Sequence, residues 1–168
     1  YPSKPSPLQF LFPLLAKLPR FLLPGPTKFL VDFGDTSKPV GAAFNNPPIA
    51  SNNGMEANTK KWRNAEIPAA NGHGTARSIA KLYGVLANGG SLDGLHILSP
   101  DTIEMARTTQ SDGKDLVLGG MHTRFGLGFM LGTKNVSMGP NSEAFGHGGA
   151  GGSLGFADPD NNISDRKE

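Results

Sequence analysis

Apolar side chains recur at helical spacing in residues 75–88. Four of them are three or four positions apart: Ile79, Leu82, Tyr83 and Leu86. This spacing places them on one face of an α-helix, and two glycines, at positions 89 and 90, end the pattern. The sequence therefore predicts a helix at 75–88 whose apolar face packs against a sheet.

A second helix is predicted to begin after Ser99. This serine can accept hydrogen bonds from free backbone N–H groups, and Pro100 suits the first helical position. Two acidic residues follow in the first turn, where the helix dipole favours negative charge: Asp101 and Glu104. Strands are predicted at residues 124–131, around 143–147 and at 153–157. Helices followed by antiparallel strands are typical of an α+β fold.

The residue pattern divides the chain into three stretches: a proline- and leucine-rich segment at 1–43, a region with the predicted elements at 44–163, and a polar tail at 164–168. Prolines and two basic residues interrupt the apolar run at 8–23. A bilayer span needs about 20 predominantly apolar residues, and this run also lacks the charged start and cleavage site of a signal peptide. We therefore expect neither a membrane span nor a signal peptide, which leaves the compartment open.

The amino-acid composition excludes several classes of binding site and catalysis. The 16 basic and 14 acidic side chains are scattered along the chain, without the positive stripe of a nucleic-acid-binding protein. Cysteine is absent, which excludes disulfides, thiolate catalysis and cysteine zinc sites. The four histidines lack the spacing of metal ligands. We expect no metal, no cofactor and no nucleic-acid partner.

The run FGHGGAGGSLGFADP, at residues 145–159, is unusually rich in glycine for a strand. Each glycine destabilises a strand by roughly 0.5–1 kcal/mol relative to alanine, so such a run indicates that backbone or ligand must approach closely. The segments NAEIPAANGHGTARSIAKLYGVLANGGSLDG, at 64–94, and LSPDTIEMAR, at 98–107, precede it.

This order of segments, over residues 45–162, resembles the C-terminal half of the beta-lactamase-related serine hydrolases. That family includes class C beta-lactamases, DD-peptidases, family VIII esterases and LACTB-like proteins. The resemblance implies a beta-lactamase/transpeptidase-like fold, in which helices pack on an antiparallel sheet. Complete members are longer and continue with another strand and a helix, so we expect an incomplete domain. An unpaired sheet edge would then favour self-association.

The nucleophile of this family is the serine of an SxxK motif, assisted by that lysine and by the tyrosine of a YxN motif. Ser78 and Lys81 have this spacing, but the run that contains them resembles a downstream, non-nucleophilic helix of the family. We interpret them as part of a solvated helix face, with a nucleophile pair as the alternative. Neither Tyr1 nor Tyr83 begins a YxN motif.

His147, Gly148 and Gly149 occupy the place of the family's KTG triplet, on the strand beside the active site. Histidine is mostly uncharged at pH 7 and offers a directed hydrogen bond instead of the lysine's charge. This difference favours an ester or peptide-like substrate over a penicillin-like acid. The N–H of Ala150 matches an oxyanion-hole donor, which is worth roughly 3 kcal/mol in a transition state. The structural alternative for His147 is that it fixes a glycine-rich turn.

We therefore expect a partial copy of a serine hydrolase that cleaves a small ester or amide through an acyl-enzyme. The resemblance implies that these 168 residues lack the catalytic serine, lysine and tyrosine and are inactive alone, the substrate being bound only when the missing half is present. Two alternatives stay open: a non-catalytic binding or assembly module derived from the family, and activity through Ser78 and Lys81.

Overall fold

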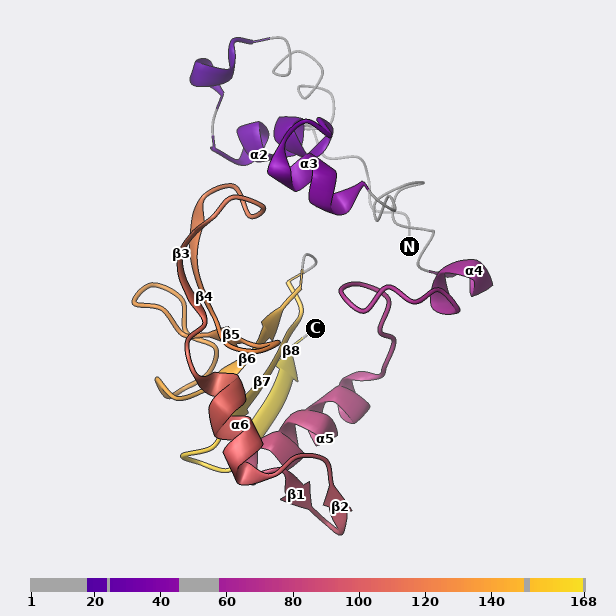
Figure 1. Ribbon diagram of the computed structural model, residues 1–168, viewed down its shortest axis with the longest axis vertical. Helices are drawn as coiled ribbons and strands as arrows, with labels where there is room; N and C mark the ends of the chain where they lie inside the picture. Colours follow the sequence, from indigo (N-terminus) through magenta and orange to yellow (C-terminus); the bar gives the residue numbers. More distant parts are fainter. Residues whose placement is uncertain (1–17, 24, 46–57, 150–151, 168) are drawn as a thin grey trace. The chain divides into compact units, whose positions relative to one another are not determined.

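The computed structural model describes four stretches of the chain: residues 18–23, 25–45, 58–149 and 152–167 (Figure 1). The chain forms two compact units. Unit 1 comprises Tyr1–Gly72 and Asp115–Met121. Unit 2 comprises His73–Lys114 and His122–Glu168.

The described part of unit 1 contains short helices: η1 Arg20–Leu22, α2 Gly25–Phe33, α3 Pro39–Phe44 and α4 Lys60–Arg63. Phe33 stacks on Phe44 with ring centroids 5.4 Å apart, which joins α2 to α3. A hydrogen bond adds to this contact between the two helices: Asn45 Nδ2 donates to the Phe33 carbonyl at 2.9 Å. Thr59 caps α4 by accepting a hydrogen bond from the Trp62 N–H.

Unit 2 is built on an antiparallel sheet with two helices, α5 Ala76–Ala87 and α6 Pro100–Arg107 (Figure 1). The sheet order is β3-β4-β5-β6-β7-β8. Its strands are β3 Ser111–Asp115, β4 Met121–Phe125, β5 Met130–Leu131, β6 Phe145–Gly148, β7 Leu154–Asp158 and β8 Ile163–Lys167. Each neighbouring pair from β4 to β8 is antiparallel. A separate hairpin pairs β1 Ser91–Leu92 with β2 Leu95–His96.

Both predicted helices are confirmed. Thr75 caps α5 by accepting a hydrogen bond from the backbone of Ser78, and Ser99 caps α6 with Pro100 at the helix start. As the apolar pattern predicted, α5 packs on the sheet, against β7 and β8. Local capping and periodicity were therefore sufficient to locate these two elements.

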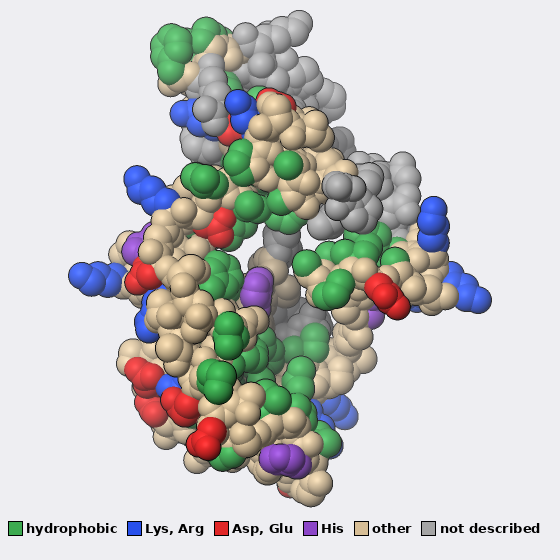
Figure 2. All heavy atoms as spheres, viewed as in Figure 1, with side chains coloured by type: hydrophobic (Ala, Val, Ile, Leu, Met, Phe, Trp, Pro, Cys, Tyr) green, Lys and Arg blue, Asp and Glu red, His purple; other side chains and the backbone are tan. Residues whose placement is uncertain are grey.

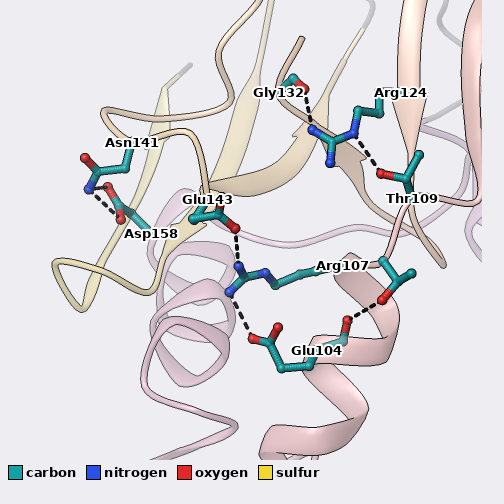
Figure 3. A network of polar contacts seen from close by, with 9 residues as sticks. Glu104, Arg107, Thr109, Arg124, Gly132, Asn141, Glu143 and Asp158 are labelled. Atoms are coloured by element: carbon teal, nitrogen blue, oxygen red, sulfur yellow. Dashed lines mark hydrogen bonds and ion pairs between the residues drawn. The ribbon is translucent and has the colours of Figure 1, made fainter.

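The core of unit 2 centres on Phe145, whose side chain is fully buried. The Phe129 ring meets it edge-on at 4.9 Å, and the Arg107 guanidinium lies 5.6 Å from its ring centre. Arg107 also contacts Glu143 at 2.7 Å and Glu104 at 3.1 Å (Figure 3). One arginine thus connects the last turn of α6 to the segment that leads into β6.

Asp158 is a buried carboxylate at the end of β7. Asn141 Nδ2 donates to both of its oxygens at 3.0 Å (Figure 3), and Asn161 donates a further side-chain hydrogen bond. Burial by itself raises the pKa of Asp158, but these bonds and the backbone N–H groups of residues 160 and 161 outweigh it and lower the pKa. The charged carboxylate therefore holds the segment around Asn141, which precedes β6, against the end of β7.

The predicted strand at 124–131 is instead two strands, β4 and β5, which pair where Phe125 faces Met130. The chain turns between them because it is bound to the end of α6. Leu127 N–H donates to the Ala106 carbonyl at 2.8 Å, and a Cβ at Gly126 would lie 2.1 Å from the same oxygen. This contact joins distant parts of the sequence, so no local pattern indicates it.

Most of the expected polar tail, residues 164–167, forms part of β8. β8 pairs with the whole of β7, from Asp158 opposite Ile163 to Leu154 opposite Lys167. Ser164 Oγ also donates to the Ala80 carbonyl of α5 at 2.9 Å. Backbone pairing, rather than apolar content, therefore holds this strand. Within the described chain, β3 and β8 are the edge strands of this sheet, and β7 is not an edge strand.

Lysine and arginine side chains are spread over the face shown in Figure 2 and do not gather in one patch. None of the helices in the described stretches is long and apolar enough to cross a membrane. Most of the apolar run at 8–23 lies outside the described residues.

Candidate functional site

Strand β6 has a partly open edge. On one side, β7 pairs with all four of its residues. On the other side, β5 pairs only with Phe145 and Gly146. Within the described chain, His147 and Gly148 thus have no strand partner on the side of β5. An edge of this kind can bind an extended ligand through backbone hydrogen bonds.

The glycines around this edge are present for different reasons. A Cβ at Gly146 would lie 2.1 Å from the Gly155 carbonyl oxygen, and one at Gly155 would lie 2.6 Å from the Tyr83 ring. Packing within the protein therefore requires glycine at both positions. Gly148 differs, because a Cβ there would meet nothing within 4 Å and its φ is not positive. Neither packing nor backbone conformation requires glycine at Gly148, which leaves room for a ligand.

His147 is exposed at this edge, and its ring has a defined orientation. Nδ1 lies 2.6 Å from the Gly148 carbonyl oxygen. A carbonyl oxygen only accepts hydrogen bonds, so Nδ1 carries a proton and Nε2 is left for a ligand. The Phe125 ring lies beside the imidazole, with ring centroids 6.2 Å apart. In the neutral ring Nε2 is an acceptor, which differs from the donor role expected from the sequence.

The turn after β6 is closed by two backbone hydrogen bonds. Gly149 N–H donates to the Ser153 carbonyl at 2.7 Å, and Gly152 N–H donates to the Gly149 carbonyl at 3.0 Å. A Cβ at Gly149 would lie 2.4 Å from Ser153 Oγ, so a larger residue there would have to displace the Ser153 hydroxyl. Ala150, the candidate oxyanion donor, lies outside the described residues.

Ser78 and Lys81 are both exposed on α5. Ser78 Oγ donates to the Thr75 carbonyl at 2.9 Å, and its backbone N–H donates to Thr75 Oγ1 at 3.1 Å. In the described chain, no hydrogen bond joins Ser78 to Lys81. The serine hydroxyl thus bonds to the first turn of the helix rather than to a lysine that could take its proton.

Tyr83 lies on the buried side of the same helix. Its ring packs edge-on against Phe129 at 6.5 Å and lies against Gly155. Burial raises the pKa of Tyr83, so its phenol stays protonated at neutral pH. A partly buried, protonated tyrosine is suited to packing and not to accepting a proton from a nucleophile.

The other described histidines do not form a metal site. His96 Nδ1 lies 2.7 Å from Ser91 Oγ, and His122 Nε2 lies 2.5 Å from Asp112 Oδ1. No group of three His, Cys, Asp or Glu side chains that could hold a metal ion occurs among the described residues.

A family model described as beta-lactamase matches residues 29–164. The chain belongs to the beta-lactamase family. Over 100 residues it is 40% identical to the esterase/beta-lactamase LipL of Mycobacterium tuberculosis (strain ATCC 25618 / H37Rv). The matched region covers 60% of this chain and 22% of LipL.

Solved structures show the same fold. A family VIII carboxylesterase is 41% identical, with a TM-score of 0.67, over 76% of this chain and 33% of that one. A penicillin-binding protein homolog from Caulobacter crescentus is 42% identical, with a TM-score of 0.60, over 72% of this chain and 33% of that one. This member of the beta-lactamase family thus has a beta-lactamase/transpeptidase-like fold and spans about a third of these structures.

Two features of the site were missed by sequence analysis. Phe125 lies beside His147 although the two are far apart along the chain, and the open edge of β6 depends on how short β5 is. Both follow from pairing between strands. The only sequence signal was the glycine-rich segment at 126–128, which interrupts the predicted strand.

Proposed function

We propose that this chain forms the substrate-binding side of a serine hydrolase that cleaves esters or amides through an acyl-enzyme. The observation that carries the proposal is the open β6 edge at His147 and Gly148. The free space at Gly148 supports it, because neither packing nor backbone conformation requires glycine at this position. The substrate lies along the edge and pairs with the strand backbone.

Each part of the edge has a role in this proposal. Gly148 admits the substrate, and the N–H of Ala150, the residue after the triplet, is assigned the role of oxyanion donor. His147 accepts a hydrogen bond at Nε2 from a substrate N–H or hydroxyl group. A penicillin-like carboxylate has no hydrogen to donate to this nitrogen, so the site better fits an amide, or an ester that carries an N–H or hydroxyl group.

The nucleophile, in this proposal, comes from outside these 168 residues. The hydroxyl of Ser78 bonds to the helix start and has no contact with Lys81 in the described chain, and Tyr83 does not begin a YxN motif. The similarity to esterases favours this hydrolase role over an assembly module. In this proposal, self-association uses the edge of β8, one of the two edge strands of the described sheet.

We expect no serine adduct when the 168-residue chain is incubated with a fluorophosphonate, since it lacks an activated serine. Intact-protein mass spectrometry measures this directly, and the variant Ser78→Ala is the control. A fluorophosphonate adduct on the chain that disappears in Ser78→Ala would show that the nucleophile lies here and that this part of the proposal is wrong.

A chimera tests the binding role. The aligned third of the family VIII carboxylesterase is replaced by the matching residues of this chain, so that the esterase supplies the nucleophile. We expect hydrolysis of a p-nitrophenyl ester and labelling of the esterase's serine. A chimera that folds and takes up the label but does not hydrolyse the ester would contradict the proposed role of this chain.

A further inference from the structure

A cavity lies next to β4 and holds Arg124, which has no carboxylate partner in the described chain. Its volume is about 560 Å³, within the range of small-molecule sites. Arg124, Lys134 and three hydroxyl residues line it: Thr133, Ser137 and Ser142. We call this cavity the Arg124 pocket.

Two neutral oxygen atoms fix the Arg124 guanidinium. Nε donates to Thr109 Oγ1 at 2.8 Å and Nη1 donates to the Gly132 carbonyl at 3.2 Å. An arginine has five N–H donors, so three remain without an acceptor in the described chain. Figure 3 shows the guanidinium between these two contacts, with its third nitrogen free of any drawn bond.

The charges around the pocket are positive in balance. Arg124 and Lys134 contribute two cations, and Asp112 is the only carboxylate among the lining residues. That carboxylate already pairs with His122 at 2.5 Å. Arg124 is half-buried, which weakens the screening of its charge by water and salt. Among the described residues, no carboxylate pairs with its guanidinium.

The Arg124 pocket is separate from the proposed substrate edge. Side chains alternate between the two faces of a strand, so Arg124 and His122 lie on one face of β4 and Phe125 on the other. Phe125 is the residue whose ring lies beside His147. The pocket thus faces away from the β6 site, and a ligand bound there would not occupy the substrate position.

We infer that the Arg124 pocket binds the oxyanion group, a carboxylate or a phosphate, of a small molecule. The free N–H groups of an oriented guanidinium match the oxygens of either group. Lys134 adds a second positive charge, and the hydroxyl of Ser142 lies on the lining for a further polar contact. The cavity is larger than a bare ion, so the ligand is an organic acid or a phosphate ester.

Nuclear magnetic resonance of the full chain tests this inference. Sodium phosphate and sodium acetate are added in separate titrations, with sodium chloride at matched ionic strength as the control for screening. We expect saturable shifts of the Arg124 Nε–H signal and of the amides at Thr133 and Ser142. The probe that saturates at the lower concentration identifies the preferred group. No saturable shift with either probe would overturn the inference.

Variants separate the pocket from general surface charge. Arg124→Gln should raise the Kd of the preferred probe about 10-fold or more, because a hydrogen bond to a charged group is worth about 1.5–3 kcal/mol. Arg77→Gln removes an exposed positive charge from α5 and should leave binding unchanged. Equal Kd values in these two variants would contradict the site.

Arg124→Gln could also disturb folding, because Arg124 donates hydrogen bonds to Thr109 and Gly132. Lys134→Gln is therefore a second variant that tests the pocket. Lys134 is exposed, so its variant should fold and should bind the probe more weakly than the unaltered chain. Unchanged binding in Lys134→Gln, together with unchanged binding in Arg124→Gln, would overturn the assignment.

Discussion

Replacing Gly148 by valine in the esterase chimera should lower kcat/KM by about 100-fold or more, the effect of losing one oxyanion-hole donor. The isopropyl group would fill the open space beside the β6 edge. A substrate held away from the strand could neither pair with its backbone nor bring its carbonyl oxygen to the Ala150 N–H. The loss should be in the rate of acylation, measured by steady-state kinetics with a p-nitrophenyl ester.

Gly113→Val is the matched control for this variant. Gly113 is also an exposed strand glycine without a positive φ, and a Cβ there would meet nothing within 4 Å. Valine suits a strand at both positions, so the two variants should have similar melting temperatures. If Gly113→Val and Gly148→Val lower kcat/KM equally, the β6 edge is not where the substrate binds.

Phe145→Ala should reduce the free energy of unfolding of unit 2 by about 3–5 kcal/mol, as for other buried aromatic side chains. The ring is fully buried and packs against Phe129 and Arg107. Its removal leaves a cavity at the start of β6 and takes away the surface on which Arg107 lies. Urea denaturation of the 168-residue chain, followed by circular dichroism, measures the change.

Phe21→Ala is the control for this loss, because Phe21 is 80% exposed. Its removal should change the free energy of unfolding by less than about 0.5 kcal/mol. If the two variants unfold at the same urea concentration, Phe145 is not the centre of a packed core. In that case the position of β6 would not depend on the contacts described here.

Local sequence signals were enough for the elements that are stabilised locally. α5 was found from its apolar spacing and the two glycines that follow it, and α6 from Ser99 and Pro100 at its start. The glycine-rich segment drew attention to β6 and β7 because so many glycines are unfavourable in a strand without a reason. The family was recognised from the order of these same segments, and the beta-lactamase match over 29–164 confirms it.

Pairing between distant segments could not be predicted in the same way. The split of the strand at 124–131 depends on a bond from Leu127 to Ala106 of α6. The polar residues at 164–167 form a strand because the edge of β7 offers backbone partners. The open edge at His147 exists because β5 ends early. Each feature reflects what the neighbouring strand or helix supplies, and not the residue pattern itself.

The position of a bound phosphonate tests the proposed role of β6 most directly. The esterase chimera is inactivated with an alkyl phosphonate and crystallised, and the location of the phosphonyl oxygen is measured. We expect this oxygen within hydrogen-bonding distance of the Ala150 N–H, with the alkyl chain along the His147 and Gly148 edge. A phosphonyl oxygen that contacts neither β6 nor the turn that follows it would contradict the account.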